Sequence, residues 1–179
     1  MIPLRRPGTK QAISALSPSA LVPALHHGGV VVWESLAISE YLAELFPDAG
    51  LWPDGRGARA EARAVSAEMH AGFAALRQAM PMNIRATPSA PERSQDVDTD
   101  IRRISAIWET CLERHGGTFL FGPFTIADAM FAPVVSRFRT YGVDLPAASR
   151  DYADAVWNTP EMRDWTAAAE AEPHAIPRL

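Results

Sequence analysis

The pair Glu34-Ser35 places a carboxylate and a hydroxyl at the start of a predicted helix. The first turn of a helix exposes backbone N–H groups and the positive end of the helix dipole, and both attract a carboxylate. The hydroxyl and amide of Ser35 could therefore hold a ligand carboxylate, while the Glu34 side chain holds an ammonium group. Together they would recognise the zwitterionic end of an amino acid. The alternative interpretation is that the pair only caps the helix.

A second candidate feature is Val22-Pro23, which stands at the start of a strand-like run. A cis peptide bond is accessible in practice only before proline, and about 5% of such bonds adopt it. In a cis turn the N–H and C=O groups of Val22 would face outward and could pair with an extended peptide, like an added strand. We predict the cis form. The alternative is a trans proline that opens an edge strand.

The run from Gly122 to Pro133, GPFTIADAMFAP, contains a threonine and an aspartate at the spacing of a helix capping box. In such a box the Thr125 hydroxyl accepts a hydrogen bond from a backbone N–H of the first turn. The Asp128 carboxylate accepts a hydrogen bond from the backbone N–H of the N-cap residue. We interpret the pair as a structural cap and not as catalytic residues. Replacing either one with alanine is expected to cost about 1 kcal/mol of stability.

Two kinds of secondary structure must position these features. Before Trp52 the sequence has short β-branched runs with Gly and Pro, and after Gly57 it has long Ala-, Arg- and Glu-rich segments with helical periodicity. We expect a short helix at 10–16, strands at 22–26 and 30–33, and helices at 34–46, 56–80, 96–115, 125–141, 148–158 and 161–171. The predicted fold class is α/β plus all-α, with an α/β domain at 1–50, a linker at 51–57 and an all-α domain at 58–179.

The composition excludes several classes of function. The net charge of −4 offers no basic field for nucleic acid or for an anionic membrane. The single cysteine, Cys111, excludes an intramolecular disulfide and a Cys-rich zinc site, and it suits a reducing compartment. The sequence has neither a signal peptide nor an apolar stretch as long as a membrane span. We therefore expect a cytoplasmic protein without a metal site.

The order of these motifs resembles the soluble, cytosolic-type glutathione S-transferase family of bacteria. Val-Pro, a Gly-turn hairpin, Glu-Ser opening ESLAISEYLAELFP, and Gly-Pro-Phe-Thr-x-x-Asp in a later helix follow one another along nearly the whole chain. The resemblance implies a thioredoxin-like, glutathione-binding N-terminal domain followed by an all-helical domain. It also implies a homodimer with a role in detoxification.

The resemblance implies glutathione as the co-substrate. Val22, before the cis Pro23, would pair through its backbone with the cysteinyl part of glutathione. Glu34 and Ser35 would hold the γ-glutamyl end. The implied reaction is conjugation of the glutathione thiol to small electrophiles.

The electrophile would lie in a hydrophobic pocket between the two domains. Met69, His70 and Phe73 are candidates to line it, because they come from the first long helix of the all-α domain. The alternative function is that of a non-catalytic binding or interaction protein with the same fold, because the usual catalytic loop is absent from the sequence.

The sequence departs from the family pattern at its start. Residues 1–4 resemble the family's second strand, so the first strand, the first helix and the Tyr, Ser or Cys that activates the glutathione sulfur have no counterpart. The catalytic residue is therefore unknown. Cys111 is interpreted as a buried structural thiol, the His26-His27 pair as turn residues and Tyr41 as a packing residue. Because the absent strand would be central in the sheet, we expect residues 1–19 to depart from the family's usual arrangement.

Overall fold

The computed structural model describes residues 2, 5–86 and 92–173, and these fall into two units. The first unit holds the described residues up to Ala49 together with 172–173, and the second spans Gly50–Ala171. The predicted fold class, a small α/β unit followed by helices, is confirmed. The predicted linker at 51–57 groups with the second unit, and a helix begins within it. Apart from Ile2, the strand expected at 1–4 lies outside the described residues.

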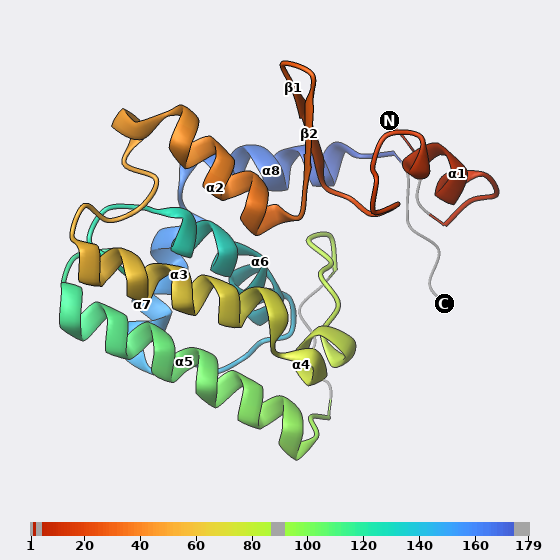
Figure 1. The fold of residues 1–179 in the computed structure, drawn as a ribbon. Helices are drawn as coiled ribbons and strands as arrows, with labels where there is room; N and C mark the ends of the chain where they lie inside the picture. Colours follow the sequence, from red (N-terminus) through yellow and green to blue (C-terminus); the bar gives the residue numbers. More distant parts are fainter. Residues whose placement is uncertain (1, 3–4, 87–91, 174–179) are drawn as a thin grey trace. The chain divides into compact units, whose positions relative to one another are not determined.

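The first unit consists of short elements around one β-hairpin (Figure 1). In chain order they are α1 (Thr9–Ser14), β1 (Ala24–His27), β2 (Val30–Trp33), α2 (Ser35–Leu45) and the 3-10 helix η1 (Pro47–Ala49). The strands pair antiparallel, with Ala24 opposite Trp33. They are joined by Gly28 and Gly29, whose φ angles of 53° and 83° suit a two-residue hairpin turn. The hairpin is confirmed, but β1 starts two residues later than predicted and includes both histidines.

The hairpin and α2 bury little of their apolar surface. No residue of β1, β2 or α2, all of which are described, is buried. Val22 and Trp33 are 61% and 42% exposed, whereas Ile13 on α1 is buried. Because hydrophobic stabilisation scales with the apolar area removed from water, burial contributes little to holding the hairpin in place.

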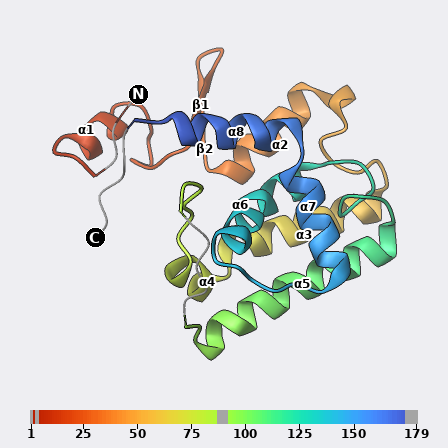
Figure 2. The same cartoon turned by 180° about the vertical axis from the view of Figure 1, so that it is seen from behind.

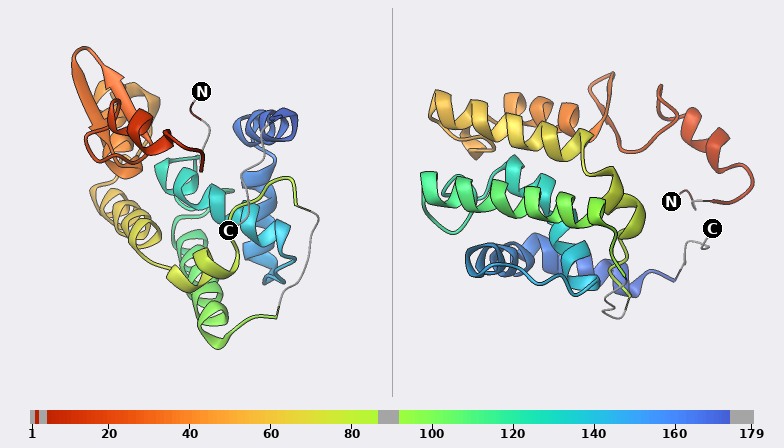
Figure 3. Two further views of the ribbon diagram at one scale, coloured as in Figure 1. Left: turned by 90° about the vertical axis from the view of Figure 1, so that its right-hand side faces the viewer. Right: turned by 90° about the horizontal axis from the view of Figure 1, so that it is seen from below.

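The second unit is all-helical, and Figures 2 and 3 show its helices from further sides. They are α3 (Arg56–Ala71), α4 (Ala74–Ala79), α5 (Gln95–His115), α6 (Ile126–Thr140), α7 (Ala147–Trp157) and α8 (Pro160–Ala171). Helix α6 packs against α3 and α7, and α5 packs against α4 and α7. Helix α6 carries more buried residues than α5, although it is shorter, so it is the central helix of this unit.

The segment 56–80, predicted as one helix, forms two helices. Gly72 is extended, with φ −98° and ψ −167°, and Phe73 has a φ of 59°, so neither residue continues the helix. A Cβ atom at Gly72 would meet the carbonyl oxygen of Glu68 at 2.8 Å, which makes glycine necessary there. The Arg77 guanidinium donates to three carbonyl oxygens at the end of α3. The prediction was wrong because the apolar periodicity continues across the break and conceals it.

An aromatic cluster forms the centre of the second unit. Trp108 on α5 is completely buried. Its ring lies 5.8 Å from Phe131, 5.6 Å from Phe138 and 4.9 Å from Tyr152, measured between centroids. Aromatic pairs in such tilted arrangements add about 0.5–1.5 kcal/mol each beyond area burial. The partners come from α6 and α7, so the cluster joins three helices.

The predicted capping box is present at the start of α6. The amide and the hydroxyl of Thr125 donate to Oδ2 of Asp128 at 2.8 and 3.1 Å. The other carboxylate oxygen accepts the amide of Leu120 at 3.0 Å. Asp128 is completely buried, and this burial raises the pKa of its carboxyl. Asp128 therefore holds the preceding loop as well as the helix terminus.

Two glutamates of α3 form ion pairs with α5. Glu61 pairs with Arg114 at 2.6 Å and with His115 at 3.0 Å. Glu68 accepts two hydrogen bonds from Arg103, at 2.6 and 2.8 Å. Burial by itself raises the pKa of Glu61, but the hydrogen bonds from His115 and Arg114 lower it overall. The bonds from Arg103 lower the pKa of Glu68. The folded unit therefore favours the charged form of both carboxylates.

Replacing Glu61 with Gln is expected to lower the free energy of unfolding by up to about 1 kcal/mol at neutral pH. The folded-state pKa of Glu61 lies below its ordinary value of 4.5, so the stabilisation is present above that value and is lost as the pH falls through the folded-state pKa. Urea unfolding at about pH 7 and about pH 3 measures the difference, which should shrink at the lower pH. Glu113→Gln, at an exposed position of α5, is the matched control. An equal loss at both pH values would contradict the ion-pair explanation.

Candidate functional site

The open end of the hairpin brings the predicted binding residues together (Figure 1). Ala24 and Trp33 form its last residue pair. The segment 22–23 lies next to this pair on one strand, and 34–35 lies next to it on the other. Residues that are far apart in the sequence therefore converge because of the strand register.

The peptide bond between Val22 and Pro23 is cis, as the sequence predicts. Val22 is 61% exposed. Among the described residues, its backbone N–H and C=O groups have no hydrogen-bond partner. Backbone groups of this kind can pair with an extended ligand, in the manner of an added strand.

Glu34 occupies the N-cap of α2 with an unusual backbone conformation. Its φ is 75° and its ψ is 125°, and its carbonyl oxygen accepts the amide of Ile38 at 2.9 Å. A non-glycine residue in such a sparsely populated region costs about 1–3 kcal/mol, and such residues concentrate at functional sites. This conformation turns the chain directly from β2 into the helix, so Glu34 stands at the helix terminus. The Glu34 residue is exposed there.

Ser35 is the first residue of α2 and is half-buried. Its carbonyl oxygen accepts the Ser39 hydroxyl at 2.9 Å. Its own hydroxyl makes no hydrogen bond within residues 5–86 and 92–173. The amides of the first helical turn have no intrahelical acceptor and point toward the helix terminus, where Ser35 also carries its hydroxyl. This set of donors suits a carboxylate.

Two histidines attach the hairpin to its neighbours. His27 Nδ1 lies 2.9 Å from the Tyr41 hydroxyl on α2, and His26 Nε2 lies 2.7 Å from the carbonyl oxygen of Leu16. The sequence predicted turn residues at these two positions, which was wrong, because both lie in β1. No local pattern could have identified the pair of His27 and Tyr41, because it depends on how α2 packs on the hairpin.

The three candidates for an electrophile pocket differ in their exposure. Met69 and Phe73 are 3% and 7% exposed, whereas His70 is exposed near the end of α3. The two apolar side chains belong to the core of the second unit. The assignment of all three to an electrophile pocket stays a prediction.

Cys111 is buried in α5 and is 1% exposed. Burial, with a smaller effect of Glu61, raises the pKa of its thiol to about 11. Because the thiolate is the nucleophilic form, this cysteine is unreactive at neutral pH. Its position agrees with the interpretation of a structural thiol.

In the part of the chain that the structure describes, no three His, Cys, Asp or Glu residues are placed to hold a metal ion together. None of the described helices is long and apolar enough to cross a membrane.

The sequence matches two family models. Residues 1–45 match the N-terminal domain of glutathione S-transferase, and residues 91–170 match its C-terminal domain. A "Probable maleylacetoacetate isomerase" of Caenorhabditis elegans is 31% identical over 76% of this chain and 64% of its own length. A "Maleylpyruvate isomerase" of a Ralstonia species is 32% identical over 76% of this chain and 67% of its own length. The chain thus spans about two thirds of the length of these relatives.

A solved structure shows the same fold. It is described as the holo structure of maleyl pyruvate isomerase, a bacterial glutathione S-transferase of the Zeta class. The similarity has a TM-score of 0.67 and 26% identity, and it covers 94% of this chain and 83% of that one.

Proposed function

The chain belongs to the glutathione S-transferase family, and from this premise we propose that it binds glutathione and conjugates its thiol to small electrophiles. The observation that supports the proposal is the backbone conformation of Glu34, which has a φ of 75° at the N-cap of α2, directly before Ser35. A strained non-glycine residue at a helix terminus needs a functional reason, because it costs stability. Recognition of the γ-glutamyl end of glutathione supplies that reason.

The residues at the open end of the hairpin fit the two ends of an amino acid. The α-carboxylate of the γ-glutamyl group would accept hydrogen bonds from the Ser35 hydroxyl and from the first amides of α2. The ammonium group would lie against the carboxylate of Glu34. The backbone of Val22 would pair with the cysteinyl part, since its N–H and C=O have no partner among the described residues. Each donor of the ligand would thus face an acceptor of the protein, and each acceptor of the ligand would face a donor.

The proposed reaction forms a carbon–sulfur bond between glutathione and an electrophile. With an aryl halide, the sulfur replaces the halide, which leaves as an anion, and the thiol proton goes to solvent. A second candidate is isomerisation of a small maleyl carboxylic acid, because both relatives and the similar structure carry the names of maleyl isomerases. We also propose a cytoplasmic homodimer with a role in detoxification, as is usual in the family.

Replacing Ser35 with Ala is expected to weaken glutathione binding at least about tenfold, because the carboxylate loses one hydroxyl donor. Isothermal titration with glutathione measures the change. Ser14→Ala is the matched control, since the exposed Ser14 hydroxyl donates to the carbonyl oxygen of Lys10 within α1. Equal affinities of wild type and Ser35→Ala would contradict the proposed binding site.

Turnover is measured separately, with an aryl halide for conjugation and a maleyl acid for isomerisation. Acceleration of either reaction that falls in Ser35→Ala supports the enzyme. Glutathione binding without acceleration of either reaction would instead favour the non-catalytic binding protein.

A further inference from the structure

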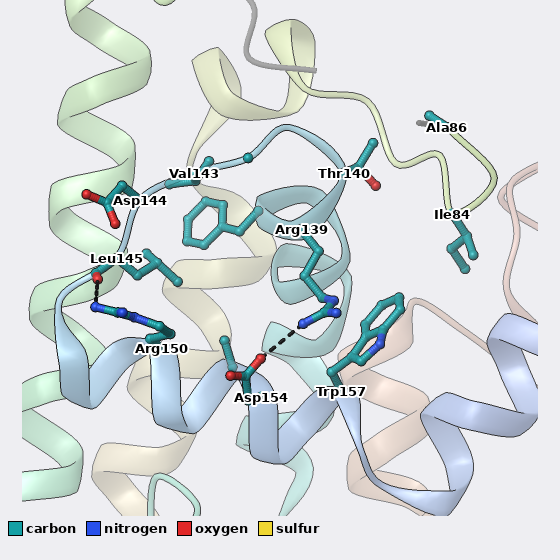
Figure 4. A pocket seen from close by; sticks show the side chains of 13 residues that line it. Ile84, Ala86, Arg139, Thr140, Val143, Asp144, Leu145, Arg150, Asp154 and Trp157 are labelled. Atoms are coloured by element: carbon teal, nitrogen blue, oxygen red, sulfur yellow. Dashed lines mark hydrogen bonds and ion pairs between the residues drawn. The ribbon is translucent and has the colours of Figure 1, made fainter. Parts of the chain in front are cut away.

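A cavity of about 450 Å³ lies in the second unit, apart from the residues proposed to bind glutathione. It is formed by the end of α6, the segment 142–145, helix α7, Ile84 and Ala86 (Figure 4). Small-molecule sites are typically clefts of about 300–1,000 Å³ with an apolar lining and a few polar groups. The volume therefore suits one small ligand.

The floor of the cavity is apolar. Phe138 from α6, Leu145 and Ala153 are 2%, 8% and 6% exposed, so they are fixed by the core behind them. Val143 and Ile84 are half-buried and extend this apolar surface. An apolar group of a ligand would displace water from a preformed surface there.

One wall of the cavity contains an ion pair that is stacked on an aromatic ring. Arg139 donates to Asp154 at 3.0 Å, and its guanidinium lies 4.7 Å from the centre of the Trp157 ring (Figure 4). The ion pair neutralises both charges, and the stacking fixes the planar groups together. This wall presents flat surface to a ligand but no uncompensated charge.

The opposite wall carries two charges that are not paired with each other. Arg150 donates to the carbonyl oxygen of Leu145 at 3.1 Å, which leaves its positive charge without a carboxylate (Figure 4). Within the described residues, neither Arg150 nor Asp144 forms an ion pair. Both residues are exposed and lie beside Leu145, so two opposite, solvated charges stand at the rim of the apolar floor.

We propose that this cavity binds a free amino acid with an apolar side chain. Its carboxylate would bind Arg150, its ammonium group Asp144, and its side chain the floor formed by Phe138 and Leu145. Arg150 and Asp144 are both exposed, so a ligand with a single charge would pair with only one of them and leave the other to water. The zwitterion satisfies both. The inference does not depend on the proposed glutathione site, whose residues all belong to the first unit.

Isothermal titration of the full chain with three probes tests the charge requirement. L-Phenylalanine carries both charges, 3-phenylpropionate lacks the ammonium group and 2-phenylethylamine lacks the carboxylate. We expect L-phenylalanine to bind at least about tenfold more tightly than either of the other two. No detectable binding of L-phenylalanine at about 10 mM, or equal affinity for one of the single-charge probes, would overturn the proposal.

Variants test the location of binding. Arg150→Gln and Asp144→Asn should each weaken L-phenylalanine binding at least about tenfold. Ser35→Ala should leave it unchanged, as should the controls Arg163→Gln and Asp151→Asn, which change exposed charges outside the cavity. Melting temperatures verify that each variant is folded. L-Phenylalanine binding that survives both Arg150→Gln and Asp144→Asn, or that is lost in Ser35→Ala, would place the ligand elsewhere and refute the inference.

Discussion

Replacing Asp128 with Ala is expected to lower the free energy of unfolding of the second unit by about 3–5 kcal/mol. This exceeds the effect predicted from the capping box alone, because the carboxylate also accepts the amide of Leu120. Leu120 is completely buried and Thr125 is 3% exposed, so water cannot replace the lost acceptor. An unpaired buried donor costs about 1–3 kcal/mol, and the substitution creates two such amides as well as a cavity. Urea unfolding followed by near-UV circular dichroism measures the change.

Two controls separate the buried network from the loss of a charge. Thr125→Ala removes only the hydroxyl arm and should cost about 1 kcal/mol. Asp151→Ala removes an exposed aspartate of α7 and should change stability by less than about 0.5 kcal/mol. A loss in Asp128→Ala no larger than that in Thr125→Ala would show that the bond to Leu120 contributes nothing.

Replacing Trp108 with Ala is expected to cost about 3–5 kcal/mol, because it removes the central ring of the aromatic cluster. The side chain is completely buried, and it contacts rings on α6 and α7. Its indole N–H has no hydrogen-bond partner among the described residues, so the loss comes from packing and not from a hydrogen bond. Thermal unfolding monitored by far-UV circular dichroism measures the change.

The matched control is Trp165→Ala, because Trp165 on α8 is 41% exposed. It should change stability by less than about 1 kcal/mol. Trp108→Phe should recover part of the loss in Trp108→Ala, because it keeps one ring and removes the unpaired N–H. Similar losses at both tryptophan positions would contradict the central role of the cluster.

Stability and proposed binding are located in different parts of the fold. Trp108 and Asp128 lie in the core of the second unit, whereas Val22, Glu34 and Ser35 lie at one end of a hairpin with no buried residue. We therefore expect Ser35→Ala to change glutathione affinity with little change in stability. The core substitutions should have the reverse effect at temperatures where the variants remain folded.

Several features were determined by the sequence alone, because their causes are local. The Gly28-Gly29 hairpin and the capping box at α6 are both confirmed. Each depends on residues at most a few positions apart, since turn geometry and helix caps are set by backbone angles and short-range hydrogen bonds. The order of an α/β unit and a helical unit followed from periodicity in the same way.

Other features were decided only by the tertiary structure. The break at Gly72 depends on the close approach of the Glu68 carbonyl, and the contact of His27 with Tyr41 depends on the packing of α2. The cavity between α6 and α7 is lined by residues of different helices, and the sequence pattern of each helix indicated only its apolar and polar faces. Similarly, the sequence gives no sign that Arg139 is neutralised by Asp154, which lies 15 residues away, while Arg150 is not. Such pairings depend on how two surfaces meet, and the free energy of a charge depends on the groups that face it in the folded chain.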